Sequence, residues 1–172
     1  MATPALRIAE DGRHDAPALP PGRDILAGLP AGSVWQAGRV AQCPQAVHPT
    51  GFSALDGELP GGGWPAGALI ELLLERPGVG ELSMLLPMLG RTPPDRWIVW
   101  LAPPLQPYAP ALARAGVPLA RLLVVRPERP QTLLWATRQA AVSGSCAAVL
   151  AWMPRIDNTG LRRLQLAAEE SG

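Results

Sequence analysis

The chain has 172 residues, of which 48% are hydrophobic and 17% are charged, a composition typical of a globular protein rather than a disordered one. No stretch of the sequence reaches the run of about 18 apolar residues that a membrane span needs, and proline interrupts the apolar segments. The first residues mix both charges and lack an apolar signal core, which predicts a cytoplasmic protein.

Basic charge comes from arginine alone: all 15 basic residues are Arg, and the net charge is +1. The absence of lysine excludes any mechanism that needs a lysine ammonium group from this chain. Residues 1–66 contain four Arg and six acidic residues, whereas residues 67–172 contain eleven Arg and eight acidic residues. This asymmetry is compatible with an anionic partner for the second half, or with an ordinary solvated surface.

Two regions differ in composition. Residues 1–48 are rich in Ala, Pro and Gly and predict a flexible arm with a short helix near residues 33–42, whereas residues 49–172 predict a folded core. The core begins with a turn-rich stretch in which Ser53–Glu58 is expected to be helical, with Ser53 as its N-cap.

From residue 68 the chain alternates between apolar runs and helical patterns. Four strands, each followed by a helix, predict an α/β fold in which helices cover both faces of a parallel sheet. The strands are expected over residues 68–74, 96–102, 121–127 and 146–153. The helices are expected over residues 80–90, 107–116, 130–144 and 158–171, the last one capped by Asn158 or Thr159.

The segment between the first predicted strand and its helix has the layout of a phosphate loop. A working loop reads G-x-x-x-x-G-K-[ST], in which backbone N–H groups, the Lys and the hydroxyl hold the phosphates and Mg²⁺. With Gly80 as the second glycine, Glu75 replaces the first glycine, Glu81 the lysine and Leu82 the hydroxyl residue. A carboxylate there would repel a triphosphate by roughly 1–4 kcal/mol per charge pair. We therefore expect a vestigial loop that binds no nucleotide, formed by Glu75, Arg76, Pro77, Gly78, Val79, Gly80, Glu81 and Leu82.

The stretch PTGFSALDGELPGGGWPAGALIELL, residues 49–73, resembles the segment that leads into the phosphate loop of RecA-type recombinases. The resemblance continues to residue 172 and implies a RecA-like sheet sandwiched by helices. In that family the second strand ends in a glutamate that activates water, where this chain has Pro103 or Pro104. The strand that carries the family's Mg²⁺-linked aspartate has Ala151 or Trp152 at that place. The resemblance thus implies a protein without catalytic residues, metal or cofactor.

Two further segments, IELLLERPGVGELSML and AVLAWMPRIDNTGLRRLQLAAE, resemble the ImuA family of RecA-like, SulA-like accessory proteins of damage-inducible translesion synthesis. This resemblance implies a non-enzymatic adaptor in the SOS response that links an ImuB-type inactive polymerase subunit to an error-prone DnaE-type polymerase, with RecA as a further candidate partner. One alternative is a SulA-type cell division inhibitor that binds the tubulin-like division ring protein. A second alternative is an NTPase whose site a partner completes. Self-association is a further expectation, because SVWQAGRVA occupies the place of a RecA subunit contact.

Arginine and tryptophan side chains are the candidate contacts. The long loop with which RecA holds DNA is reduced here to MPRIDNTG, so direct DNA binding is left open. Seven arginines either bind nucleic acid or another anionic partner, or are ordinary surface charges: Arg114, Arg121, Arg126, Arg129, Arg155, Arg162 and Arg163. Trp35 and Trp64 either anchor the arm or contact a partner. The core is expected to hold Trp97, Trp100, Trp135, Trp152 and the stripe Leu82, Leu85, Leu86 and Leu89.

Overall fold

The computed structural model describes residues 46–171, which belong to a unit formed by residues 37–172. The helix expected near residues 33–42, Trp35 and almost all of the predicted arm lie outside the described residues. Within residues 46–171, no helix is both long enough and apolar enough to cross a membrane.

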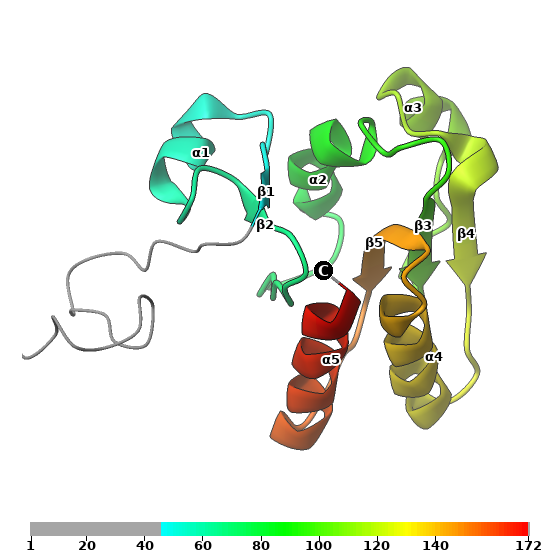
Figure 1. The fold of residues 1–172 in the computed structure, drawn as a ribbon. Coiled ribbons are helices and arrows are strands. Elements are labelled where there is room, and N and C mark those ends of the chain that lie inside the picture. Colours follow the sequence, from blue (N-terminus) through cyan, green and yellow to red (C-terminus); the bar gives the residue numbers. More distant parts are fainter. Residues whose placement is uncertain (1–45, 172) are drawn as a thin grey trace, which may run out of the picture. The chain divides into compact units, whose positions relative to one another are not determined.

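The described part begins with a small turn module. Strand β1 (Val47–His48) pairs antiparallel with β2 (Trp64–Pro65), and helix α1 (Ser53–Glu58) lies between them in the sequence (Figure 1). The predicted helix is confirmed. Its predicted cap is wrong, because Phe52 holds the N-cap position and no side chain makes a cap hydrogen bond.

Hydrogen bonds of buried Thr50 and half-buried Asp56 hold this module together in place of a helix cap. The Thr50 N–H donates to Asp56 Oδ1 at 2.8 Å, and the Phe52 N–H donates to Thr50 Oγ1 at 3.0 Å. Gly63 is required for close approach, since a Cβ at that position would lie 2.5 Å from the His48 carbonyl oxygen.

The larger part of the described chain alternates helices and strands. Its elements follow the predicted order closely, which confirms seven of the eight elements expected after residue 68. They are α2 (Glu81–Leu89), β3 (Trp97–Leu101), α3 (Ala109–Arg114), the 3-10 helix η1 (Leu119–Arg121), β4 (Leu122–Val125), α4 (Pro130–Val142), β5 (Cys146–Ala151) and α5 (Asn158–Ser171).

The predicted first strand over residues 68–74 is wrong. This segment has no regular secondary structure, and the side chain of Leu73 is 91% exposed. The described sheet instead has three parallel strands in the order β4-β3-β5. An apolar run favours burial, but a strand also needs a neighbour for its backbone hydrogen bonds, and the described sheet offers this segment none.

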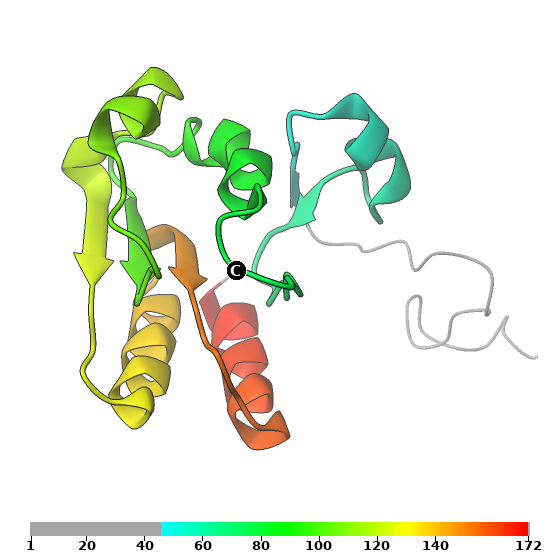
Figure 2. The ribbon, with the colours of Figure 1, turned by 180° about the vertical axis from the view of Figure 1, so that it is seen from behind.

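Strand β3 lies in the middle of the sheet, and its side chains alternate between two hydrophobic clusters. Ile98 and Trp100 face α2 and α3, where they pack with Leu89 and Leu112. Val99 and Leu101 face the other way and pack with Leu133 of α4. Helix α5 packs against α4, and the two helices lie side by side in both views (Figures 1 and 2).

The leucine stripe of α2 belongs to the core, as predicted. Leu89 is fully buried, and the three other leucines of the stripe pack against its cluster. The four tryptophans expected in the core divide into two groups. Trp100 is 1% exposed and meets Trp152 edge to face at 5.7 Å between ring centroids. The prediction is wrong for Trp97 and Trp135, which are 38% and 63% exposed.

The amino terminus of α5 also departs from the expected cap. Asp157, not Asn158 or Thr159, accepts the hydrogen bond, from the Gly160 N–H at 2.8 Å. Asp157 immediately precedes the helix, which is the position from which a side chain best reaches the free backbone donors of the first turn.

Candidate functional site

The loop of residues 75–80 lies directly before α2, and its shape depends on two glycines. Gly78 and Gly80 have φ values of 85° and 122°, which favour glycine because other residues rarely adopt them. Gly80 is the N-cap residue of α2, and Glu81 is the first helical residue. The loop therefore presents backbone N–H groups at a helix amino terminus, the arrangement that favours anions.

The carboxylate of Glu81 occupies these donors. The Gly78 N–H donates to Glu81 Oε1 at 2.8 Å, and the Gly80 N–H donates to Glu81 Oε2 at 3.2 Å. The side chain is only 7% exposed. At the position where a phosphate loop has lysine, this chain carries an internal anion that binds the loop's own backbone.

The charge of this buried carboxylate is stabilised. Burial raises the pKa of Glu81. Hydrogen bonds lower the pKa by a larger amount; they come from the backbone of Gly78, Glu81 and Gly80 and from the Trp152 indole. The net pKa therefore lies below the usual 4.5. The positive end of α2 acts in the same direction. Glu81 is therefore an ionised structural group at neutral pH.

This geometry opposes the binding of a phosphate group at the loop. A phosphate would have to displace Glu81 from its backbone donors and then lie beside its charge. A lysine supplied by a partner would add a cation but would leave Glu81 in place. Among residues 46–171, no three His, Cys, Asp or Glu residues lie close enough together to hold a metal ion.

Three of the seven candidate arginines do not lie together in the structure. Arg121 precedes β4 and Arg126 follows it, so they lie at opposite ends of the strand, roughly 16 Å apart along an extended chain. The Arg121 guanidinium lies over the Trp97 ring at 5.2 Å from its centroid. Arg114 lies on α3. These three arginines do not form one anion-binding surface around β4.

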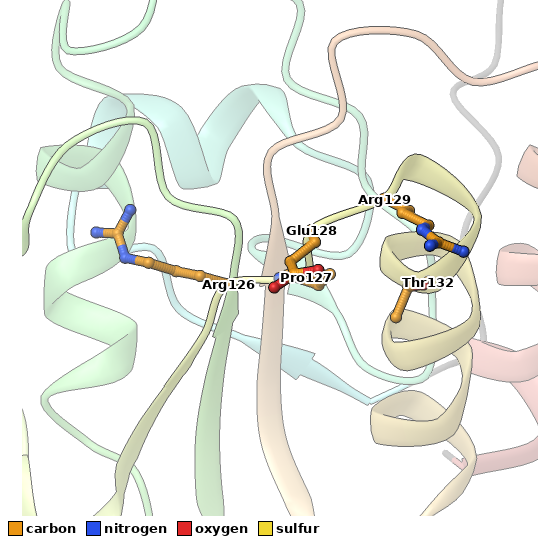
Figure 3. A pocket seen from close by; sticks show the side chains of 5 residues that line it. All are labelled: Arg126, Pro127, Glu128, Arg129 and Thr132. Carbon is orange, nitrogen blue, oxygen red and sulfur yellow. The ribbon is translucent and has the colours of Figure 1, made fainter.

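Arg126 is engaged inside the chain. It donates to the carbonyl oxygens of Pro103 and Leu105 at 3.1 and 3.3 Å and to Gln106 Oε1 at 3.2 Å. A cavity of about 420 Å³ beside it is lined by Arg126, Pro127, Glu128, Arg129 and Thr132 (Figure 3). Arg126 points away from Arg129 in this view, and Glu128 lies between them (Figure 3). The cavity thus lacks converging positive charges.

The remaining candidate partner contacts, one tryptophan and three arginines, differ in how exposed their side chains are. Trp64 is 5% exposed, so its side chain is buried rather than presented on the surface. Arg155 follows β5 and is exposed. Arg162 donates to Gln165 Oε1 at 3.3 Å along α5, whereas Arg163 lines a second cavity with residues of α4.

Two loops at the carboxyl ends of the strands carry exposed apolar side chains that the sequence analysis did not single out. A Cβ at Gly78 would lie 3.9 Å from Leu105 Cδ1, so the loop before α2 and the loop after β3 are neighbours. The apolar loop surface, as we name it, consists of Leu73, Leu74, Val79, Leu105 and Tyr108, exposed by 91, 41, 53, 70 and 69%. An apolar run that ends in a Gly-Pro loop is the only sequence signal for it.

Helix α4 presents a further residue that the sequence analysis missed as a surface group. Leu133, Ala136, Thr137 and Ala140 form its inward stripe, at positions i, i+3, i+4 and i+7. Trp135 lies off this stripe, so the helical period alone would have placed it on the surface.

Comparison with known proteins identifies the family. A family model described as "Cell division inhibitor SulA" matches residues 68–172. A cell division inhibitor SulA of Yersinia enterocolitica is 29% identical over 107 residues, which cover 60% of this chain and 62% of that protein. Its counterpart in Yersinia pestis is 30% identical over 88 residues, covering 51% of this chain and 52% of that protein. The chain thus spans between half and two thirds of the length of these relatives.

A solved structure agrees with the sequence matches. The crystal structure of SulA from Pseudomonas aeruginosa has a TM-score of 0.51 and 25% sequence identity to this chain, and the match covers 62% of this chain and 92% of the other.

These matches correct the family resemblance drawn from the sequence. The ImuA assignment is wrong, and so are the translesion adaptor function and the ImuB-type, RecA and DnaE-type partners that it implied. The RecA-like fold is also wrong: the fold is SulA-like, with a three-stranded parallel sheet in the described residues and no strand over 68–74. Alternating strands and helices, which many α/β proteins share, could not separate these families. The chain belongs to the SulA family of cell division inhibitors.

Proposed function

We propose that this chain is a non-enzymatic, cytoplasmic inhibitor of cell division that acts by binding the tubulin-like division ring protein. The observation that carries the proposal is the family match over residues 68–172, because this range contains all three strands of the parallel sheet and the helices that cover it.

The loop before α2 supports a binding role rather than a catalytic one. Its backbone donors are satisfied by the Glu81 carboxylate, so they serve the stability of the loop. The same loop contributes Val79 to the apolar loop surface. A fixed loop that exposes apolar side chains can bind a protein with little loss of conformational entropy.

We assign the contact with the ring protein to the apolar loop surface. Exposed apolar groups gathered on neighbouring loops are typical of protein interaction sites, because association removes them from water. The chemistry of the contact would be dominated by Leu73 and Leu105, the two most exposed large apolar side chains of the described residues.

A sedimentation assay of ring polymers tests the function and the surface together. The purified full chain, added in equimolar amount, is expected to reduce the sedimented fraction of the ring protein, and its expression in the source bacterium is expected to produce filamentous cells. Leu73→Ser combined with Leu105→Ser should abolish both effects.

Leu119→Ser is the matched control, because Leu119 is a 39% exposed leucine on η1, which precedes β4 and so lies at the opposite end of the sheet. If the unsubstituted chain left the sedimented fraction of the ring protein unchanged, the proposed function would be refuted. Inhibition that survives the double substitution would refute only the assignment of the surface.

A further inference from the structure

The outer face of α4 and α5 carries a tryptophan that no core contact explains. Trp135 is 63% exposed, and the inward stripe of α4 excludes it. Gln131 and Arg138 lie four residues before and three residues after it, so all three share one face of the helix. Exposing so large an apolar side chain is unfavourable unless a partner covers it.

Two arginines flank this tryptophan. Arg138 from α4 and Arg163 from α5 line a shallow cavity of about 250 Å³ together with Gln131, Leu134 and Trp135. Neither guanidinium makes a hydrogen bond or an ion pair with any residue of 46–171. Both groups therefore retain donors suited to carboxylates.

Carboxylates occur near this face, but none lines the cavity. The chain from Glu128 to Ser171 contains five arginines and four acidic residues, Glu128, Asp157, Glu169 and Glu170. Asp157 caps α5 by accepting from the Gly160 N–H, and Glu169 accepts from the Gln165 side-chain amide. No acidic side chain among the lining residues competes for the two arginines.

We infer that this face binds an acidic peptide segment of a protein partner, with one apolar side chain of the segment on Trp135 and Leu134 and its carboxylates on Arg138 and Arg163. The cavity is smaller than a drug-sized ligand needs, roughly 300–1,000 Å³, but it suits a single side chain. Single-stranded nucleic acid is the less suitable occupant, because it binds through several aromatic platforms, and Trp135 is the one aromatic residue of α4 and α5. This inference does not depend on the proposed function.

Fluorescence anisotropy with a defined probe tests the inference on the full chain. The probe is a labelled ten-residue peptide of Asp and Glu around one central Leu, and its matched control replaces every acid by Asn or Gln. We expect saturable binding of the acidic peptide below about 1 mM and at least about tenfold weaker binding of the amide peptide. Trp135→Ala and the pair Arg138→Glu with Arg163→Glu should each weaken binding by about tenfold or more.

The control pair Arg114→Glu with Arg155→Glu carries the same change in net charge, but Arg114 lies on α3 and neither residue lines the cavity. It should bind the peptide within about threefold of the unsubstituted chain, because exposed charges away from the cavity are largely screened. Equal losses in both pairs would overturn the inference in favour of a general charge effect.

Two other occupants give different results. Binding of an oligothymidylate that the Arg138/Arg163 pair abolishes, with no binding of the acidic peptide, would identify a nucleic-acid surface and overturn the inference. A dimer in sedimentation velocity that dissociates on Trp135→Ala would identify a contact between two copies and would overturn it as well.

Discussion

The loop before α2 and the outer face of α4 and α5 differ in how their polar groups are used. In the loop, a buried carboxylate satisfies the backbone donors of Gly78 and Gly80. On the helix face, Arg138 and Arg163 keep their donors free among the described residues, beside an exposed tryptophan. The loop with the layout of a ligand site uses its own side chain to satisfy its donors, whereas the helix face that carries Trp135, a residue expected in the core, has groups available for binding.

A sequence motif therefore indicates where backbone donors gather but not which acceptor binds them. One residue, Glu81, converts an anion-binding geometry into a structural contact. Four variants test this contrast between the two regions.

Removal of the internal carboxylate should have the largest effect. Glu81→Ala leaves the Gly78 and Gly80 N–H groups without an acceptor and should lower the free energy of unfolding by about 2–3 kcal/mol. Urea denaturation followed by circular dichroism measures this change. Glu75→Ala, at an exposed position of the same loop, is the control and should change it by less than about 0.5 kcal/mol. If Glu81→Ala and Glu75→Ala lowered the free energy of unfolding by the same amount, the Glu81 hydrogen bonds would not be a specific source of stability.

The same carboxylate should make stability depend on pH. Because its pKa in the folded chain lies below the usual 4.5, the unfolded chain binds more protons in acid. The contribution is present above pH 4.5 and is lost as the pH falls through the folded pKa. The free energy of unfolding of the unsubstituted chain should therefore fall more steeply below pH 4.5 than that of Glu81→Gln, in urea titrations at stepped pH. If the free energy of unfolding fell equally steeply with pH in both proteins, Glu81 would not be the group responsible.

Arg126 should give an intermediate effect, because its contacts with Pro103, Leu105 and Gln106 hold the loop that bears part of the apolar loop surface. Arg126→Ala should cost about 1 kcal/mol of unfolding free energy and should weaken inhibition of ring assembly. Arg129→Ala, in the same cavity without these contacts, serves as the reference and should do neither. If Arg126→Ala and Arg129→Ala lost the same stability and inhibition, the contacts of Arg126 would not be what holds the loop.

Trp135→Ala should have the smallest effect on stability. Its side chain is 63% exposed, so the free energy of unfolding should change by less than about 0.5 kcal/mol in thermal or urea denaturation. A loss comparable to that of a buried tryptophan, about 3–5 kcal/mol, would show that Trp135 is a core residue and would remove the contrast between the two regions.

The sequence allowed most elements to be located, because their signals are local. Apolar periodicity, together with proline at helix starts, located α4, β5 and α5 within a few residues, and the turn residues located α1. The strand predicted over residues 68–74 was wrong because strand formation depends on a neighbouring strand, which a local sequence pattern does not reveal.

The candidate site was predictable in part. The unsuitability of Glu75, Glu81 and Leu82 for a phosphate site was predictable from the sequence, but the hydrogen bonds from Gly78 and Gly80 to Glu81 depend on the loop's three-dimensional path. The separation of Arg121 from Arg126 follows once β4 is assigned between them. Family identity could not be read from the alternation of strands and helices, and it came from direct matches over residues 68–172.

Calorimetric titration of the full chain into the monomeric division ring protein, under conditions that prevent polymer assembly, measures the proposed contact itself. We expect saturable binding with a defined stoichiometry, and loss of that binding in the Leu73→Ser and Leu105→Ser double variant. An absence of heat and of any shift in sedimentation at concentrations up to about 100 μM, equivalent to a binding free energy weaker than about −5.5 kcal/mol, would contradict it.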